Sequence, residues 1–160
     1  MKKRAAAFLF FIFFSFAAFA SDMQLQAIGA STASNLYLSY LSIGVIADSY
    51  TKKVYEKEQT VIFVNSVVAQ AGVQKEYLRK MMESGDIPEN EHYFVEKLIK
   101  CYELLMDEGN NLVDYVKTGS NSSLMKYDNK RKEAWSLISE IMGWGANNFE
   151  LPPSGLVSYK

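Results

Sequence analysis

The stretch PENEHYFVEKLIKCYELL, residues 88–105, carries the clearest helical pattern of the chain and holds its only histidine and only cysteine. Pro88 suits the first turn of a helix, Glu89 and Glu91 suit the positive end of the helix dipole, and Asp86 is a candidate cap. Apolar side chains then recur at steps of three and four residues, which is typical of one buried helix face. This stripe consists of Phe94, Leu98, Cys101, Leu105, Leu112 and Tyr115.

Glycine and proline bound this helix and the one that follows it. The stripe has a gap at Glu108, and Gly119 closes the helix. A fourth helix begins at Ser122 or Ser123 and stops at Gly143. Its stripe contains Leu124, Tyr127, Arg131, Ala134, Trp135, Ile138, Ile141 and Met142.

The segment before the "SGDIP" break, residues 22–84, carries one apolar stripe almost without interruption. A single helix of that length would be roughly 90 Å long, and its partners would be too short to cover it. We therefore expect a turn within residues 48–59 and two helices of about 30 residues each. The alternative is one long kinked helix. The pattern predicts an all-α fold, an up-and-down four-helix bundle over residues 21–145 after an N-terminal signal peptide.

Residues 1–20, MKKRAAAFLFFIFFSFAAFA, have the pattern of a secretory signal peptide. Three basic residues precede an apolar run, which ends in Ala18-Phe19-Ala20 before a polar stretch. The run is shorter than the roughly 20 residues that cross a bilayer as a helix, although an uncleaved anchor remains the alternative. The sequence predicts a periplasmic or secreted protein that contacts the membrane only through an uncleaved signal peptide.

Charge and cysteine content limit the function classes. Removal of Lys2, Lys3 and Arg4 with the signal peptide leaves 14 basic and 18 acidic side chains, so a surface for nucleic acid is not expected. With Cys101 alone, no intrachain disulfide can form. Since Cys101 falls on the apolar stripe, we expect a buried thiol; a reactive thiol is the alternative.

The spacing Glu89-x-x-His92 occurs in di-metal carboxylate bundles, but such a site needs two histidines and this chain has one. His92 and Glu96 are four residues apart on one helix face and remain a weak candidate metal site. We interpret His92 as structural or solvated, and we predict no cofactor.

Signatures of common enzymes are missing from the sequence. It has no Gly-x-Ser-x-Gly, no phosphate-binding glycine loop and no His-Glu-x-x-His. We therefore predict no catalytic residues and a protein that is not an enzyme.

Polar residues beside the apolar stripes are the candidate ligand site. Buried polar groups need partners, so these residues either bond across helices or line a pocket between them. The candidates for an interhelical ligand-binding site are Asn35, Tyr40, Asn65, Ser66, Asn111 and Tyr115.

Residues 146–160 are predicted to form an extended tail, because Pro152 and Pro153 enforce extended backbone. The tail packs back along the bundle or docks on a partner or a second copy. The first functional hypothesis is an exported, non-catalytic helical-bundle protein, of sensor or accessory type, that binds a small molecule or a protein partner. The second is a metal- or redox-linked bundle protein, and the third is a subunit of a homo-oligomer.

Overall fold

The structure is a computed structural model that describes residues 2–144, with side chains described for Met23 and for residues 26–144. The predicted tail, residues 146–160, lies outside the described residues. So do the side chains of the predicted signal peptide, residues 1–20.

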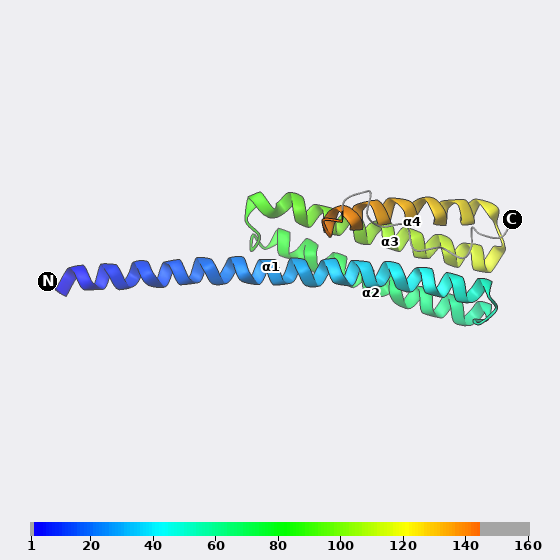
Figure 1. Ribbon diagram of the computed structural model, residues 1–160, viewed down its shortest axis with the longest axis horizontal. Coiled ribbons are helices and arrows are strands. Elements are labelled where there is room, and N and C mark those ends of the chain that lie inside the picture. The colour runs from blue at the N-terminus through cyan, green and yellow to red at the C-terminus, as the bar shows by residue number, and fades with distance from the viewer. Residues whose placement is uncertain (1, 145–160) are drawn as a thin grey trace. The chain divides into compact units, whose positions relative to one another are not determined.

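The described residues form four α-helices and no strand (Figure 1). The all-helical class predicted from the sequence is confirmed. Helix bounds are α1 Lys2–Thr51, α2 Lys57–Glu83, α3 His92–Thr118 and α4 Asn121–Ile141, with a 3-10 turn η1 at Glu89–Glu91.

The chain divides into two compact units, Met1–Ser34 and Asn35–Lys160. Within its described residues the first unit contains only the N-terminal part of α1. No helix in the part of the chain that the structure describes combines the length and the hydropathy needed to span a membrane.

The second unit is consistent with a four-helix bundle, in which successive helices run in opposite directions (Figure 1). Helix α3 contacts the other three helices. At Gly109 it comes so close to α2 and α1 that an added Cβ would collide with Val68 and touch Ile43, so the helices pack here only because the residue is glycine. On the other side Glu108 of α3 pairs with Arg131 of α4.

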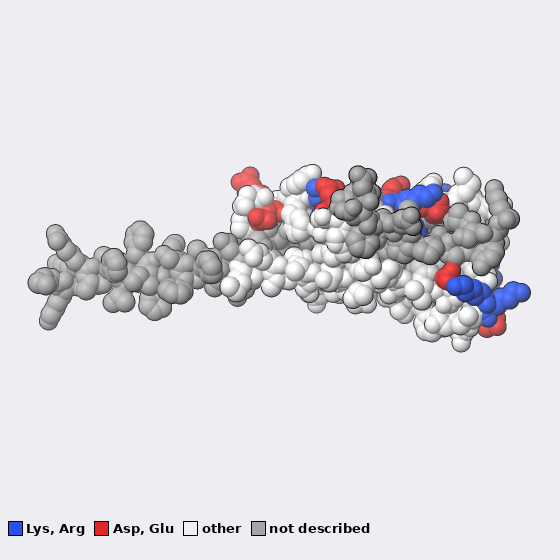
Figure 2. All heavy atoms as spheres, in the orientation of Figure 1, with Lys and Arg blue, Asp and Glu red and all other residues white. Residues whose placement is uncertain are grey.

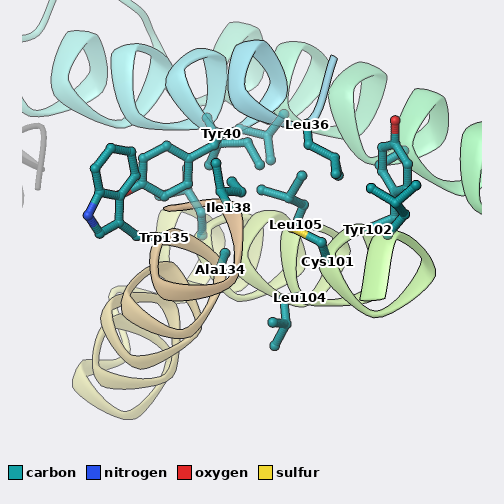
Figure 3. Packing of buried hydrophobic residues seen from close by; sticks show 14 of the residues in the cluster. Leu36, Tyr40, Cys101, Tyr102, Leu104, Leu105, Ala134, Trp135 and Ile138 are labelled. Carbon is teal, nitrogen blue, oxygen red and sulfur yellow. The ribbon is translucent and has the colours of Figure 1, made fainter. Parts of the chain in front are cut away.

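Apolar side chains of all four helices form one core, and Figure 3 shows Leu36 and Tyr40 of α1 pointing toward Leu105 of α3 and Trp135 of α4. The cysteine lies in this core, fully buried as its position in the stripe predicted. Most residues of the predicted stripes therefore lie in the core. The fully buried apolar side chains among the described residues are Leu36, Tyr40, Ile43, Ala47, Val64, Ala71, Leu98, Cys101, Tyr102, Leu105, Leu112, Tyr127, Ala134 and Ile138.

The first turn lies where the sequence predicted it. Helix α1 ends at Thr51 and α2 begins at Lys57, so the alternative of one long kinked helix is wrong. Lys53 takes a left-handed conformation (φ 58°), and the backbone N–H of Glu56 donates to the Gln59 side chain at 3.1 Å, which starts α2. Val54 lies in this turn, outside both helices, and is exposed.

Two predicted helix starts need correction by a few residues. Helix α4 is capped by Ser120 rather than by Ser122 or Ser123, since the Ser120 hydroxyl accepts from the Ser123 N–H at 3.5 Å. Asp86 is not the cap of α3: its carboxylate accepts from Ser84. The two glutamates predicted for the first turn of α3 instead form η1 directly before it. The predicted closure at Gly119 is confirmed, with φ 70° and its N–H bonded to Tyr115 O at 2.7 Å.

Candidate functional site

A buried ion pair joins α3 and α4 inside the bundle. Arg131 Nη1 donates to Glu108 Oε1 at 2.8 Å, and the two side chains are 3% and 0% exposed. Glu108 is the residue that interrupts the α3 stripe, and Arg131 occupies a core position of the α4 stripe. Charged side chains are almost never fully buried unless they are paired, so each helix depends on the other at this point.

Helix α1 completes the surroundings of this pair. Arg131 Nη1 also donates to the Tyr40 carbonyl at 3.3 Å, and the guanidinium carbon lies 4.0 Å from the centroid of the Tyr40 ring. Gly44 leaves the space that the guanidinium fills, because an added Cβ would lie 2.5 Å from Arg131 Nη2. The fully buried ring of Tyr127 adds a second phenol. We call Tyr40, Glu108, Tyr127 and Arg131 the buried charge cluster.

The buried charge cluster keeps unused hydrogen-bonding capacity. Tyr40 Oη, Glu108 Oε2, Tyr127 Oη and Arg131 Nε have no hydrogen-bond partner among the described residues. Buried polar atoms normally have one, and each missing partner costs free energy of folding. The cluster therefore links three helices at a cost that a purely apolar core would avoid.

Burial is the main cause of the pKa shifts in the buried charge cluster. It raises the pKa of the Glu108 carboxyl to about 7, although the charge of Arg131 acts in the opposite direction. Burial also raises the pKa of both phenols, Tyr40 and Tyr127, so both are neutral at ordinary pH. Since all four residues are at most 2% exposed, the arrangement is suited to holding the three helices together.

A shallow apolar groove of about 470 Å³ lies between α1 and α2 on the surface. Its prominent side chains are Leu38, Val45 and Phe63, which are 60%, 61% and 42% exposed. We call it the α1/α2 groove. Its lining residues are Leu38, Leu41, Ser42, Val45, Ile46, Tyr55, Phe63, Ser66 and Val67.

The two serines do little to make this groove polar. The Ser42 hydroxyl donates to the Leu38 carbonyl at 2.7 Å, and the Ser66 hydroxyl donates to the Ile62 carbonyl at 2.9 Å. Each hydroxyl proton is thus used within its own helix, a common fate of serine in helices. The groove therefore offers a partner mainly apolar contact.

The helices that form the groove are also free of charge over long stretches. No Asp, Glu, Lys or Arg occurs in residues 23–47 or 59–74. Figure 2 shows the result on the face it presents: acidic and basic side chains gather over α3 and α4 and at the α1–α2 turn, with uncharged surface between them. An apolar groove within an uncharged surface is typical of a site for another apolar surface.

A second hollow, of about 540 Å³, lies beside the α1–α2 turn. It is lined by Tyr50, Thr51, Lys53, Tyr55, Glu56, Lys57 and Tyr115. The Lys57 ammonium donates to the Lys117 carbonyl at 2.8 Å and so ties the start of α2 to the end of α3.

The structure places the six predicted ligand residues at separate positions. Asn35 accepts a hydrogen bond of 2.9 Å from the Tyr102 hydroxyl, and Tyr40 is buried under Arg131. Only Tyr40 thus belongs to the buried charge cluster.

The other four predicted ligand residues lie nearer the surface. Asn65 and Ser66 are exposed on α2, and Ser66 borders the α1/α2 groove. Asn111 donates to the Asp107 carbonyl at 2.6 Å, and Tyr115 lines the hollow beside the turn. The six residues therefore do not meet in one interhelical site.

The candidate metal ligands are placed as follows. His92 is half-buried with Nε2 at 3.1 Å from the Ile87 carbonyl, and Glu96 is exposed. Among the residues that the structure describes, no three His, Cys, Asp or Glu side chains are grouped so that they could hold a metal ion. Burial raises the pKa of the Cys101 thiol to about 12, so it is not a thiolate at neutral pH.

Two signals in the sequence pointed to features that the prediction missed. Glu108 and Arg131 are opposite charges at core positions of successive helices, and that pattern indicates a buried pair. The charge-free runs in the first two helices indicate an uncharged surface as well as a core.

No protein-family model matches the chain, and neither the curated proteins nor the solved structures provide a match.

Proposed function

We propose that the chain is an exported, non-catalytic helical-bundle protein, of sensor or accessory type, that binds a protein partner along the α1/α2 groove. The observation that carries this proposal is the exposure of Leu38, Val45 and Phe63 in a groove without charged lining. The signal-peptide pattern of residues 1–20 supports export to the periplasm or beyond. Alternating helix directions support an up-and-down bundle as the mature domain.

The partner is expected to present an uncharged helix with an apolar stripe. A groove between two parallel or antiparallel helices accepts such a helix, with anchors at steps of three and four residues. Complete burial of one leucine or valine side chain contributes about 1.5–3 kcal/mol, so three half-exposed side chains can supply much of the affinity of a weak complex. A charged partner would lose hydration without gaining an ion pair here.

Site-specific photo-crosslinking in cells tests the proposal. A benzophenone amino acid at position 38 should form one defined adduct with another protein, whose identity mass spectrometry then gives. The same amino acid at position 125 is the control, because Met125 is 67% exposed on α4 and outside the groove. The purified partner should then bind the purified chain.

A matched pair of variants sharpens the result. Val45→Lys places a charge in the groove and should abolish the adduct and the binding, whereas Met125→Lys should leave both unchanged. Both positions are more than 60% exposed, so the fold should tolerate either change, which circular dichroism checks. A bound small molecule found by native mass spectrometry, with no adduct at position 38, would contradict the proposal of a protein partner.

A further inference from the structure

The hollow beside the α1–α2 turn differs from the α1/α2 groove in its chemistry. Three half-buried tyrosines line it, Tyr50 of α1, Tyr55 of the turn and Tyr115 of α3. Two exposed lysines, Lys53 and Lys57, line it as well. Its volume of about 540 Å³ falls within the range of about 300–1,000 Å³ that is typical of small-molecule sites. The hollow therefore combines aromatic surface with positive charge in a space of ligand size.

The two ammonium groups of this lining are not paired with a carboxylate. No ion pair among the described residues includes Lys53, Lys57 or the third charged lining residue, Glu56. Lys52, by contrast, pairs with Asp48 of α1 at 2.5 Å. Two lysines and one glutamate give the lining a net positive charge, which attracts an anion of low charge.

Local structure fixes both lysines at the hollow. Lys53 has φ 58°, a left-handed conformation that glycine or asparagine adopts at less cost than lysine. Lys57 Nζ donates one of its three protons to the Lys117 carbonyl at 2.8 Å, so the ammonium is anchored and two donors remain. A lysine kept in a strained conformation and a second one with an anchored ammonium together indicate a use for the positive charge.

The tyrosines favour a ligand that contains a ring. Tyr55 is held in place by Phe63, with ring centroids 5.1 Å apart in an edge-to-face arrangement. Aromatic side chains bind other rings by stacking or by edge-to-face contact, and a tyrosine hydroxyl can donate to an anion. Tyr115 is the one of the six predicted ligand residues that lines this hollow. An aromatic body therefore fits against the tyrosines while an anionic group reaches the lysines.

We propose that the hollow beside the α1–α2 turn binds a small organic monoanion that carries an aromatic ring, an aromatic carboxylate. The carboxylate accepts hydrogen bonds from the ammonium groups of Lys53 and Lys57, and the ring lies against the three tyrosines. Glu56 in the lining disfavours ligands with two or more negative charges. The inference goes beyond the proposed function, because the hollow shares only Tyr55 with the lining of the α1/α2 groove.

Titration of the purified chain with benzoate, phenylacetate and 3-phenylpropionate tests the proposal. At least one should bind and shift the backbone amide NMR signals of residues 50–57 and 115–118. Its uncharged amide, which has nearly the same shape, should bind about tenfold more weakly, because it loses the charge-assisted hydrogen bonds. Acetate, which lacks the ring, should also bind about tenfold more weakly. Absence of binding by all three acids at millimolar concentration, or equal affinity of acid and amide, would overturn the proposal.

Matched lysine variants locate the site. Lys53→Met and Lys57→Met should each weaken binding by up to about fivefold, the loss expected for an exposed charge pair. Lys80→Met is the control, because Lys80 is exposed in the last turn of α2, about 35 Å along the helix from Lys57. Circular dichroism checks that the three variants fold.

Two results would overturn the assignment to the hollow. One is an equal effect, or no effect, of all three lysine substitutions. The other is a set of NMR shifts confined to residues of the α1/α2 groove, Leu38 and Val45 among them. Because no protein partner takes part in these titrations, either result leaves the proposed function in place.

Discussion

At the scale of single residues, the buried pair of Glu108 and Arg131 makes a charge-dependent contribution to the stability of the bundle. Both side chains are almost fully buried, and Glu108 has one oxygen without a partner in the described residues. Removing one member of such a pair leaves an uncompensated charge, whereas replacing both by apolar residues is often neutral. The pair thus makes the stability of the bundle dependent on pH.

The pH dependence has a definite sign. Burial raises the pKa of Glu108 from 4.5 to about 7, so between these values the folded chain binds more protons at this site than the unfolded chain. The stability from this group is fully present below pH 4.5 and is lost as pH rises through 7. We expect Glu108→Gln to remove this loss of stability at rising pH. Urea unfolding of the variant and the parent chain between pH 4 and pH 8 would measure it. Identical slopes for the variant and the parent chain would contradict the assignment.

Loss of the Arg131 cation should destabilise the fold most at pH values above the pKa of Glu108, where the Glu108 carboxyl is charged. We expect Arg131→Met to reduce the free energy of unfolding by about 3–5 kcal/mol at pH 8, and by less at pH 5, where Glu108 becomes neutral. Urea titration at the two pH values measures the difference. Lys130→Met is the control, because Lys130 pairs with Glu133 at the surface and its loss should change little. An equal loss at both pH values would show that packing, and not the charge of Glu108, causes the effect.

At the scale of helices, the close approach of α1 to α4 depends on Gly44. Its missing side chain leaves the space in which the guanidinium of Arg131 reaches both Glu108 and the Tyr40 carbonyl. Glycine lowers the intrinsic stability of a helix, so its presence inside α1 calls for a packing reason, and the guanidinium supplies one.

Two glycine substitutions should therefore have opposite effects. Gly44→Ala places a Cβ 2.5 Å from Arg131 Nη2 and should destabilise the fold by roughly 1–3 kcal/mol. Gly72→Ala places its Cβ at 3.6 Å from Met106 Cε, an ordinary contact, and should stabilise α2 by up to about 1 kcal/mol. Thermal melts of the two variants compare them directly. Stabilisation by Gly44→Ala would show that Arg131 moves aside without cost.

Much at this scale followed from local sequence signals. The turn between α1 and α2 and the closure of α3 at Gly119 lie where the sequence predicted them. The starts of α3 and α4 were misplaced by a few residues, because several serines and acidic residues compete as caps and only the final backbone path selects one. Cys101 was placed in the core because three- and four-residue periodicity depends on the helix alone.

At the scale of the whole molecule, the proposed export would change the N-terminus of the chain. If residues 1–20 are a signal peptide, cleavage after Ala20 produces a mature protein that begins at Ser21 and loses three basic residues. We expect N-terminal sequencing of the protein from a periplasmic or secreted fraction to begin at Ser21. Recovery of the intact N-terminus from the membrane fraction would instead support an uncleaved anchor.

The sequence by itself determined the helical class, the division into four helices and the apolar stripes that form the core. These features depend on local periodicity and on the positions of glycine and proline. Only the tertiary structure decided which polar residues are buried together. It paired Glu108 with Arg131 and left Asn65 exposed on α2, since neighbours across a bundle depend on how far each helix is rotated about its axis. It likewise placed the uncharged runs of α1 and α2 side by side, which created the groove from which the function is inferred.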